Sequence, residues 1–83
     1  IMVKEIIRTD NFLRQLNKID KSFLERIEKM IIKILNDPEI GKPMRYERKG
    51  TRELYLSSFR LNYAYEKEKD IVIFLDIYHK GKQ

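Results

Sequence analysis

The chain has 83 residues, of which 42% are apolar and 37% are charged, and its formal net charge is +5. This length suits one small domain with a single core, so we interpret residues 1–83 as one domain. The basic balance favours an acidic partner, either nucleic acid or an acidic protein. The chain has no cysteine and a single histidine, which excludes a disulfide framework and argues against a metal centre, and we expect no cofactor.

The apolar runs of the chain are short. The longest, residues 71–75, is far too short to cross a bilayer, and residues 1–4 lead at once into a polar segment without a signal-peptide pattern. We therefore expect a cytoplasmic protein that does not enter a membrane.

The first half of the chain predicts one strand and two helices. Residues 2–8 are typical of a strand, and Thr9 or Asp10 can cap a helix by accepting bonds from its first free N–H groups. Asp20 is a second potential cap, and Pro38 ends the second helix because proline cannot donate a backbone hydrogen bond. Apolar residues recur at helical spacing in both segments: Phe12, Leu13, Leu16 and Ile19, then Phe23, Leu24, Ile27, Met30, Ile31, Ile34 and Leu35. The two helices should form an αα-hairpin with a very short connection.

The second half predicts an irregular loop and three strands. Residues 38–50 hold both prolines and two of the three glycines, which favours a loop. Alternating side chains predict strands over 52–57, 60–66 and 71–78, joined by connections short enough for hairpins. The element order is β-α-α-β-β-β. We predict an α+β fold with an N-terminal strand and a helical hairpin packed on one face of an antiparallel sheet.

The alternation sorts the strand side chains into two faces. The leucines and isoleucines, including those of 71–77, should face the helices, with Tyr63 and Tyr65 on the same side as core residues whose hydroxyls reach the rim. The opposite face should then carry Tyr55, Arg60, Asn62, Asp76, Tyr78 and, by extension, Lys80.

Cations gather beside that second face. Between Lys42 and Arg52 there are five cations (Lys42, Arg45, Arg48, Lys49 and Arg52) and one acid, Glu47. Cations bind phosphates, and tyrosine rings can stack on unpaired bases, which is how proteins usually hold single-stranded RNA. A polyanion site, with RNA as the first candidate, is therefore the leading hypothesis, and a solvated basic loop is its alternative.

The arrangement resembles the RelE/ParE toxin superfamily of toxin–antitoxin systems. The resemblance covers nearly the whole chain and rests on the helical hairpin, the loop leading to Met44-Arg45, and three strand segments. These segments are Arg52–Leu56 (RELYL), Phe59–Tyr63 (FRLNY) and Tyr78–Lys80 (YHK). RelE-like members are messenger RNA interferases that cut codons in the ribosomal A site without a metal, by attack of a ribose 2′-hydroxyl on the adjacent phosphate.

The resemblance implies roles for particular residues. Arg60 would be the main phosphate clamp, Lys80 would stabilise charge or protonate the leaving oxygen, and His79 would be an acid or base. Glu53 is a possible carboxylate base. The RNA-binding set would be Arg45, Arg48, Lys49, Arg52, Tyr55, Tyr78 and Lys82. The implied partners are the ribosome, messenger RNA and a small acidic RelB-like antitoxin, in a possible toxin–antitoxin heterotetramer.

Other readings of the same residues remain open. The best-known ribosome-dependent members carry lysines where this chain has Glu53 and Tyr55, which favours either a ParE-like toxin that binds DNA gyrase or an inactive RNA- or ribosome-binding relative. Arg60 can simply pair with Asp76 across the sheet. Lys80 can belong to a solvated tail, and a histidine at a strand end, such as His79, is often only a surface residue.

Overall fold

The computed structural model describes residues 2–82, with the backbone but not the side chain of Lys82. It contains two α-helices and a five-stranded sheet of order β1-β5-β4-β3-β2, joined by short 3₁₀ turns. The helices and strands are β1 (Glu5–Arg8), α1 (Asp10–Asn17), α2 (Leu24–Asn36), β2 (Lys42–Pro43), β3 (Arg52–Leu56), β4 (Phe59–Glu66) and β5 (Ile71–His79). The 3₁₀ turns are η1 (Lys21–Phe23), η2 (Tyr46–Arg48) and η3 (Lys80–Lys82).

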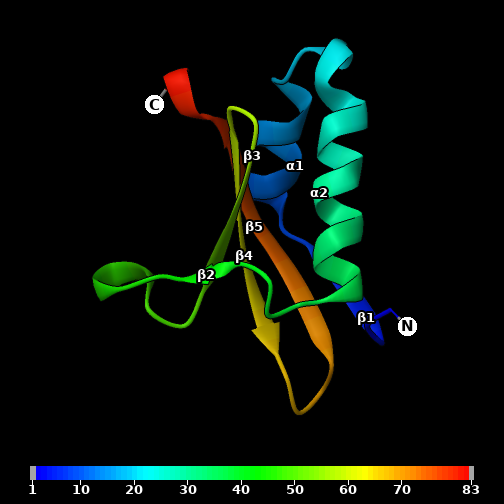
Figure 1. The fold of residues 1–83 in the computed structure, drawn as a ribbon, viewed down its shortest axis with the longest axis vertical. Helices are drawn as coiled ribbons and strands as arrows, with labels where there is room; N and C mark the ends of the chain where they lie inside the picture. The colour runs from blue at the N-terminus through cyan, green and yellow to red at the C-terminus, as the bar shows by residue number, and fades with distance from the viewer. Residues whose placement is uncertain (1, 83) are drawn as a thin grey trace.

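The helices lie on one side of the sheet, and the segment that contains η2 projects from the other side (Figure 1). This arrangement confirms the predicted α+β class and the order of the main elements. It differs from the prediction in two details. The loop over 38–50 contains the two-residue strand β2, and β1 runs parallel to β5, so the sheet is mixed and not purely antiparallel. Tight hairpins fix the relative directions of β3, β4 and β5 only. The two helices separate β1 from these strands in the sequence, so no hairpin constrains its direction, which depends on how it packs beside β5.

Side-chain caps begin both helical segments, as predicted. The Thr9 hydroxyl accepts the Phe12 N–H at 3.1 Å, and the Asp20 carboxylate accepts the Ser22 N–H at 2.8 Å. The second cap starts η1, which continues directly into α2. Neither helix, within residues 2–82, is long and apolar enough to span a bilayer.

The core lies between the helices and the sheet. Its fully buried members include Phe12, Met30 and Ile34 from the helices and Leu61 and Tyr63 from β4. The rings of Phe12 and Phe74 stack at 5.2 Å between their centroids, which ties α1 to β5.

The predicted facing of β5 is wrong before Asp76. Asn62 pairs with Asp76 but Tyr63 pairs with Phe74, so β5 contains one extra residue at this point, a β-bulge. Because the bulge reverses the alternation, Val72 and Phe74 face the helices together with Ile77, and the other apolar residues of β5 are only partly buried. The facing of Asp76 and Tyr78 is unaffected, since they follow the bulge.

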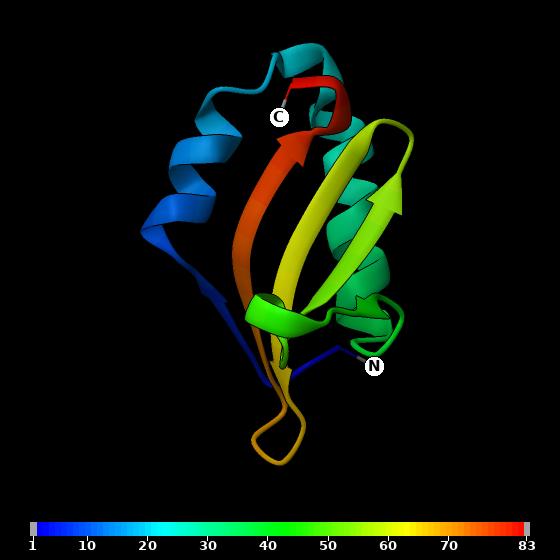
Figure 2. The same cartoon turned by 90° about the vertical axis from the view of Figure 1, so that its left-hand side faces the viewer.

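A buried tyrosine fixes the start of the basic loop, which we define as residues 42–52. The Tyr63 hydroxyl donates to the Pro38 carbonyl at 2.7 Å and accepts the Gly41 N–H at 2.9 Å. Arg52 adds bonds from its guanidinium to the carbonyl oxygens of Glu39, at 2.9 Å, and Gly41, at 2.8 Å. The segment that leads into the basic loop is therefore held against the sheet, while the loop crosses in front of it (Figure 2).

Candidate functional site

A hollow of about 420 Å³ lies on the sheet face away from the core. We call it the central hollow. Its walls come from α1, η2, β4 and β5, and its lining residues are Gln15, Arg48, Arg60, Asp76 and Tyr78. The strand register explains this convergence, because Arg60 pairs with Tyr78 and Asn62 pairs with Asp76, which places their side chains on one face.

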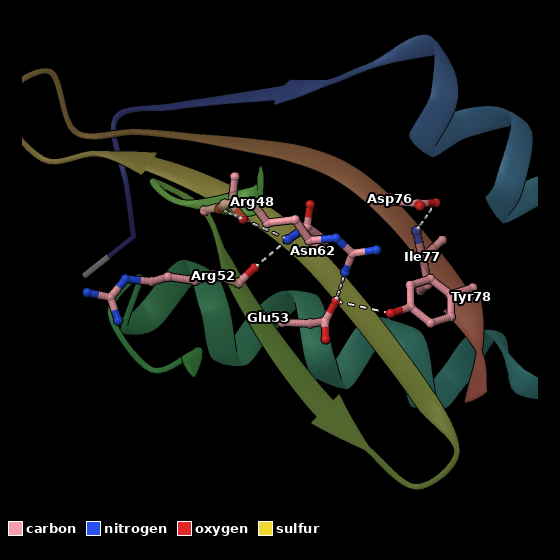
Figure 3. A network of polar contacts seen from close by, with 8 residues as sticks. Arg48, Arg52, Glu53, Asn62, Asp76, Ile77 and Tyr78 are labelled. Carbon is pink, nitrogen blue, oxygen red and sulfur yellow. Dashed lines mark hydrogen bonds and ion pairs between the residues drawn. The ribbon is translucent and has the colours of Figure 1, made fainter. Parts of the chain in front are cut away.

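A buried carboxylate lies under the central hollow. Glu53 is 2% exposed, and its Oε2 accepts bonds from Arg48 Nη1 at 3.1 Å and from the Tyr78 hydroxyl at 3.2 Å (Figure 3). Its Oε1 is buried and has no hydrogen-bond partner within the described part of the chain. A buried charge with half of its acceptor capacity unused is costly to maintain, which is more typical of a functional group than of one that serves stability alone.

Arg60 presents a cation to the central hollow. Its guanidinium carbon lies 4.6 Å from the centroid of the Tyr55 ring, in cation–π geometry. Interaction with Tyr78 raises the pKa of Arg60 above its ordinary value, so the group stays charged. The buried Nε of Arg60 has no hydrogen-bond partner among residues 2–82, and no ion pair to Asp76 is found there. The guanidinium is therefore held by an aromatic ring and retains capacity for an anion.

Two polar residues shape the floor and rim of the central hollow. Asn62 donates to the Thr51 hydroxyl and to the Arg52 carbonyl, both at 3.1 Å, and so fixes the end of the basic loop over the sheet. Asp76 accepts the N–H of Ile77 at 2.9 Å and leaves carboxylate capacity toward the central hollow. Figure 3 shows both residues beside the bonds of Glu53.

The structure brings together only part of the predicted site. Five predicted residues meet at or beside the central hollow: Arg48, Glu53, Tyr55, Arg60 and Tyr78. Arg45 and Lys49 are exposed on the basic loop, and Lys80 is exposed in η3, where its N–H bonds the Ser58 carbonyl. The side chain of Lys82 lies outside the described residues.

Arg52 and His79 lie on the other side of the sheet from Arg60. Arg52 pairs with the core residue Tyr63 and binds the carbonyl oxygens that precede the basic loop. His79 pairs with the core residue Phe59, and the two rings meet edge to face at 5.0 Å between their centroids. The structure thus separates both residues from the central hollow.

Two lining residues were not predicted as site residues. The alternation predicts the correct face for Asp76, where the sequence indicates only a pairing partner for Arg60. Asp76 lies two residues before Tyr78 on the same strand, and this spacing indicates that both side chains lie on the same face of the sheet. Gln15 comes from α1, and no pattern within that helix indicates contact with the open face of the sheet.

The combined geometry suits a phosphate ester better than a metal ion. Residues 2–82 contain no group of three or more histidines, cysteines or carboxylates able to hold a metal. The central hollow instead offers two guanidinium groups, one carboxylate at its rim, and a tyrosine hydroxyl that is bonded to the buried Glu53; these groups belong to Arg48, Arg60, Asp76 and Tyr78. Such a set can bind an anion and move a proton beside it.

Comparison with known proteins identifies relatives. A sequence profile of the ParE toxin of type II toxin–antitoxin systems (parDE) matches residues 4–83. The chain is similar to the RelBE2 toxin–antitoxin complex from Mycobacterium tuberculosis, with 25% identity, a TM-score of 0.85 and coverage of 95% of this chain and 99% of that chain. No curated protein sequence matches it significantly.

Two further solved structures share the fold. The intact Escherichia coli RelBE complex has 20% identity, a TM-score of 0.75 and coverage of 94% of this chain and 96% of that chain. The archaeal RelE–RelB complex from Pyrococcus horikoshii has 15% identity, a TM-score of 0.73 and coverage of 99% and 100%.

Proposed function

The chain belongs to the ParE toxin family of type II toxin–antitoxin systems, and we propose that this toxin cleaves messenger RNA in the ribosomal A site. The observation that carries the proposal is the meeting of Arg60, Tyr78 and the buried Glu53 around one open hollow. A toxin that acted only by binding a protein would have no need of a buried, half-satisfied carboxylate at its surface hollow.

Arg60 is proposed to hold the scissile phosphate. A guanidinium can contact two phosphate oxygens at once, and the Tyr55 ring keeps this one in place. As the 2′-oxygen attacks phosphorus, negative charge grows on these oxygens, and a fixed cation stabilises it. Lys80 is proposed as a second cation near the end of β5.

Tyr78 and Glu53 are proposed to remove the 2′-hydroxyl proton together. Glu53 is 2% exposed and cannot itself meet the ribose, but Tyr78 lines the central hollow and donates to Glu53 at 3.2 Å. The 2′-hydroxyl gives its proton to the Tyr78 oxygen while Tyr78 passes its own proton to Glu53. The new bond joins the 2′-oxygen to phosphorus, the bond to the 5′-oxygen breaks, and that oxygen takes a proton from water. Arg48 places a positive charge 3.1 Å from the Glu53 carboxylate and holds it beside Tyr78.

An acidic antitoxin is the proposed natural partner. The similar M. tuberculosis, E. coli and P. horikoshii structures are toxin–antitoxin complexes. The net charge of +5 and the exposed cations of the basic loop suit an acidic segment that covers the central hollow.

The test is cleavage of messenger RNA in a translating ribosome extract, with the 5′ ends mapped by primer extension. Wild type is expected to cut at A-site codons only when ribosomes are present, and Arg60→Ala should lower the rate by about a hundredfold or more. Lys69→Ala, which removes an exposed cation from the β4–β5 turn, is the matched control and should cut normally. Full activity of the Arg60 variant, with an unchanged circular dichroism spectrum, would refute the assignment.

A ParE-like toxin that binds DNA gyrase is the second candidate. The match to the ParE profile and the separation of His79 from the central hollow favour it. A gyrase supercoiling assay separates the two functions, because this candidate predicts inhibited supercoiling together with intact messenger RNA.

A further inference from the structure

An exposed tyrosine on the basic loop has a strained backbone. Tyr46 is 89% exposed and has a φ angle of 60°, in the left-handed region that bulky residues rarely adopt. Such a conformation costs free energy, and a fully solvated ring gives little packing in return. The fold therefore holds this ring outward at a cost that its own contacts do not explain.

Tyr46 borders a second hollow, beside the central one. We call it the loop hollow, and its volume is about 420 Å³. It lies where β2 joins the sheet, and its lining residues are Lys42, Pro43, Met44, Arg45, Tyr46 and Tyr55. Tyr55 connects the two hollows, because it lines the loop hollow and also supports the Arg60 guanidinium.

The chemistry of the loop hollow combines flat rings with cations. Tyr46 and the half-exposed Tyr55 offer ring surface, and Lys42 and Arg45 supply two exposed positive charges. None of the described residues that line it is acidic. Cations alone attract any acidic polymer, whereas exposed rings beside them select for planar groups such as nucleobases.

We propose that the loop hollow binds one base of a single-stranded RNA, next to the nucleotide whose phosphate Arg60 holds. The base stacks on Tyr46, and Arg45 and Lys42 contact the backbone phosphates on either side of its nucleotide. This inference rests on the proposed function in one respect, that RNA is the ligand. It adds a binding site outside the central hollow and assigns a role to Tyr46, which takes no part in the cleavage chemistry.

Binding of a fluorescein-labelled hexauridylate, followed by anisotropy at low salt, tests the stacking. Tyr46→Ala should raise the Kd about tenfold, within the range for losing one stacked base, and Tyr46→Phe should bind like wild type. A ribose-phosphate hexamer without bases is the matched ligand. Wild type should bind it about tenfold more weakly, and Tyr46→Ala should cause no further loss.

Salt dependence separates the ring from the cations. Arg45→Ala should reduce the slope of log K against log salt by roughly one, because it removes a phosphate contact, while Tyr46→Ala should leave the slope unchanged. Tyr46→Asn tests the strain, since asparagine tolerates the left-handed region. It should be at least as stable to urea as wild type and yet bind hexauridylate about tenfold more weakly.

Several results would overturn the proposal. The first is that Tyr46→Ala binds hexauridylate with wild-type affinity, and the second is that wild type does not bind hexauridylate. The third is that Tyr46→Ala loses as much affinity for an oligoglutamate peptide as for RNA, which would indicate an acidic polypeptide as the ligand. Failure of the cleavage reaction is a separate result. If wild type cuts messenger RNA but Tyr46→Ala binds normally, only the loop hollow is wrongly assigned. If base-dependent binding occurs without cleavage, only the nuclease proposal fails.

Discussion

Replacing Gly41 by alanine should destabilise the protein by about 3 kcal/mol. The added Cβ would lie 2.7 Å from the Tyr63 hydroxyl oxygen and 2.8 Å from its Cε1. Because Tyr63 is fully buried, its ring cannot swing away, and overpacking of this kind costs roughly 1–3 kcal/mol. Any shift that relieves it weakens the bond between the Gly41 N–H and the Tyr63 hydroxyl, at a further cost of about 1 kcal/mol or more. A chain of this size has a total stability of about 4–12 kcal/mol, so the loss is a large fraction.

Urea denaturation followed by circular dichroism measures this loss, and two other glycines provide controls. Among the described residues, the atom nearest to a Cβ at Gly81 is His79 Nδ1, at 3.6 Å, so Gly81→Ala should change the free energy of unfolding by less than about 0.5 kcal/mol. A Cβ at Gly50 meets no atom of the described residues within 4 Å, but its φ of 96° strains any side chain, so Gly50→Ala should cost about 1 kcal/mol. Equal stability of Gly41→Ala and Gly81→Ala would show that Tyr63 does not anchor the basic loop in the way described.

Two more predictions concern buried polar groups. Glu53→Gln should change the free energy of unfolding by less than about 1 kcal/mol in urea denaturation, because removal of a buried charge offsets the loss of its hydrogen bonds. The same variant should slow the proposed messenger cleavage about a hundredfold, and a normal rate would remove Glu53 from the proposed mechanism. Tyr63→Phe should cost about 2 kcal/mol at neutral pH, since two backbone groups lose their partner. Burial raises the pKa of Tyr63, so the stability it confers is present below its unfolded pKa of about 10 and is lost as the pH rises further. Wild type should therefore lose stability more steeply than Tyr63→Phe as the pH rises above about 10, and parallel curves would contradict this.

The sequence predicted most of the fold because its local signals agree with one another. Thr9, Asp20 and Pro38 mark the helix boundaries through backbone chemistry that acts over a few residues. The prediction of which β5 side chains face the helices was wrong because the first five residues of β5 are all apolar, so their alternation carries no information. The bulge that reverses the facing arises from the pairing of β5 with β4.

The candidate site was predictable where strands alone position it. Tyr55, Arg60 and Tyr78 are placed by alternation, and all three lie on the open face. Arg48 and Arg52 belong to one run of cations, but the path of the loop sends the first to Glu53 and the second to the carbonyl oxygens of Glu39 and Gly41. Sequence spacing does not encode that path, because a loop without periodicity leaves side-chain direction to tertiary contacts.

The position of β5 has a consequence for how the toxin is made. Among residues 2–82, β5 follows the other four strands in sequence, yet it lies between β1 and β4 and carries Asp76 and Tyr78. A nascent chain that has not released β5 from the ribosome cannot join β1 to the rest of the sheet or assemble the central hollow. The central hollow of the toxin therefore forms only after residues 71–79 have left the ribosome that synthesises them.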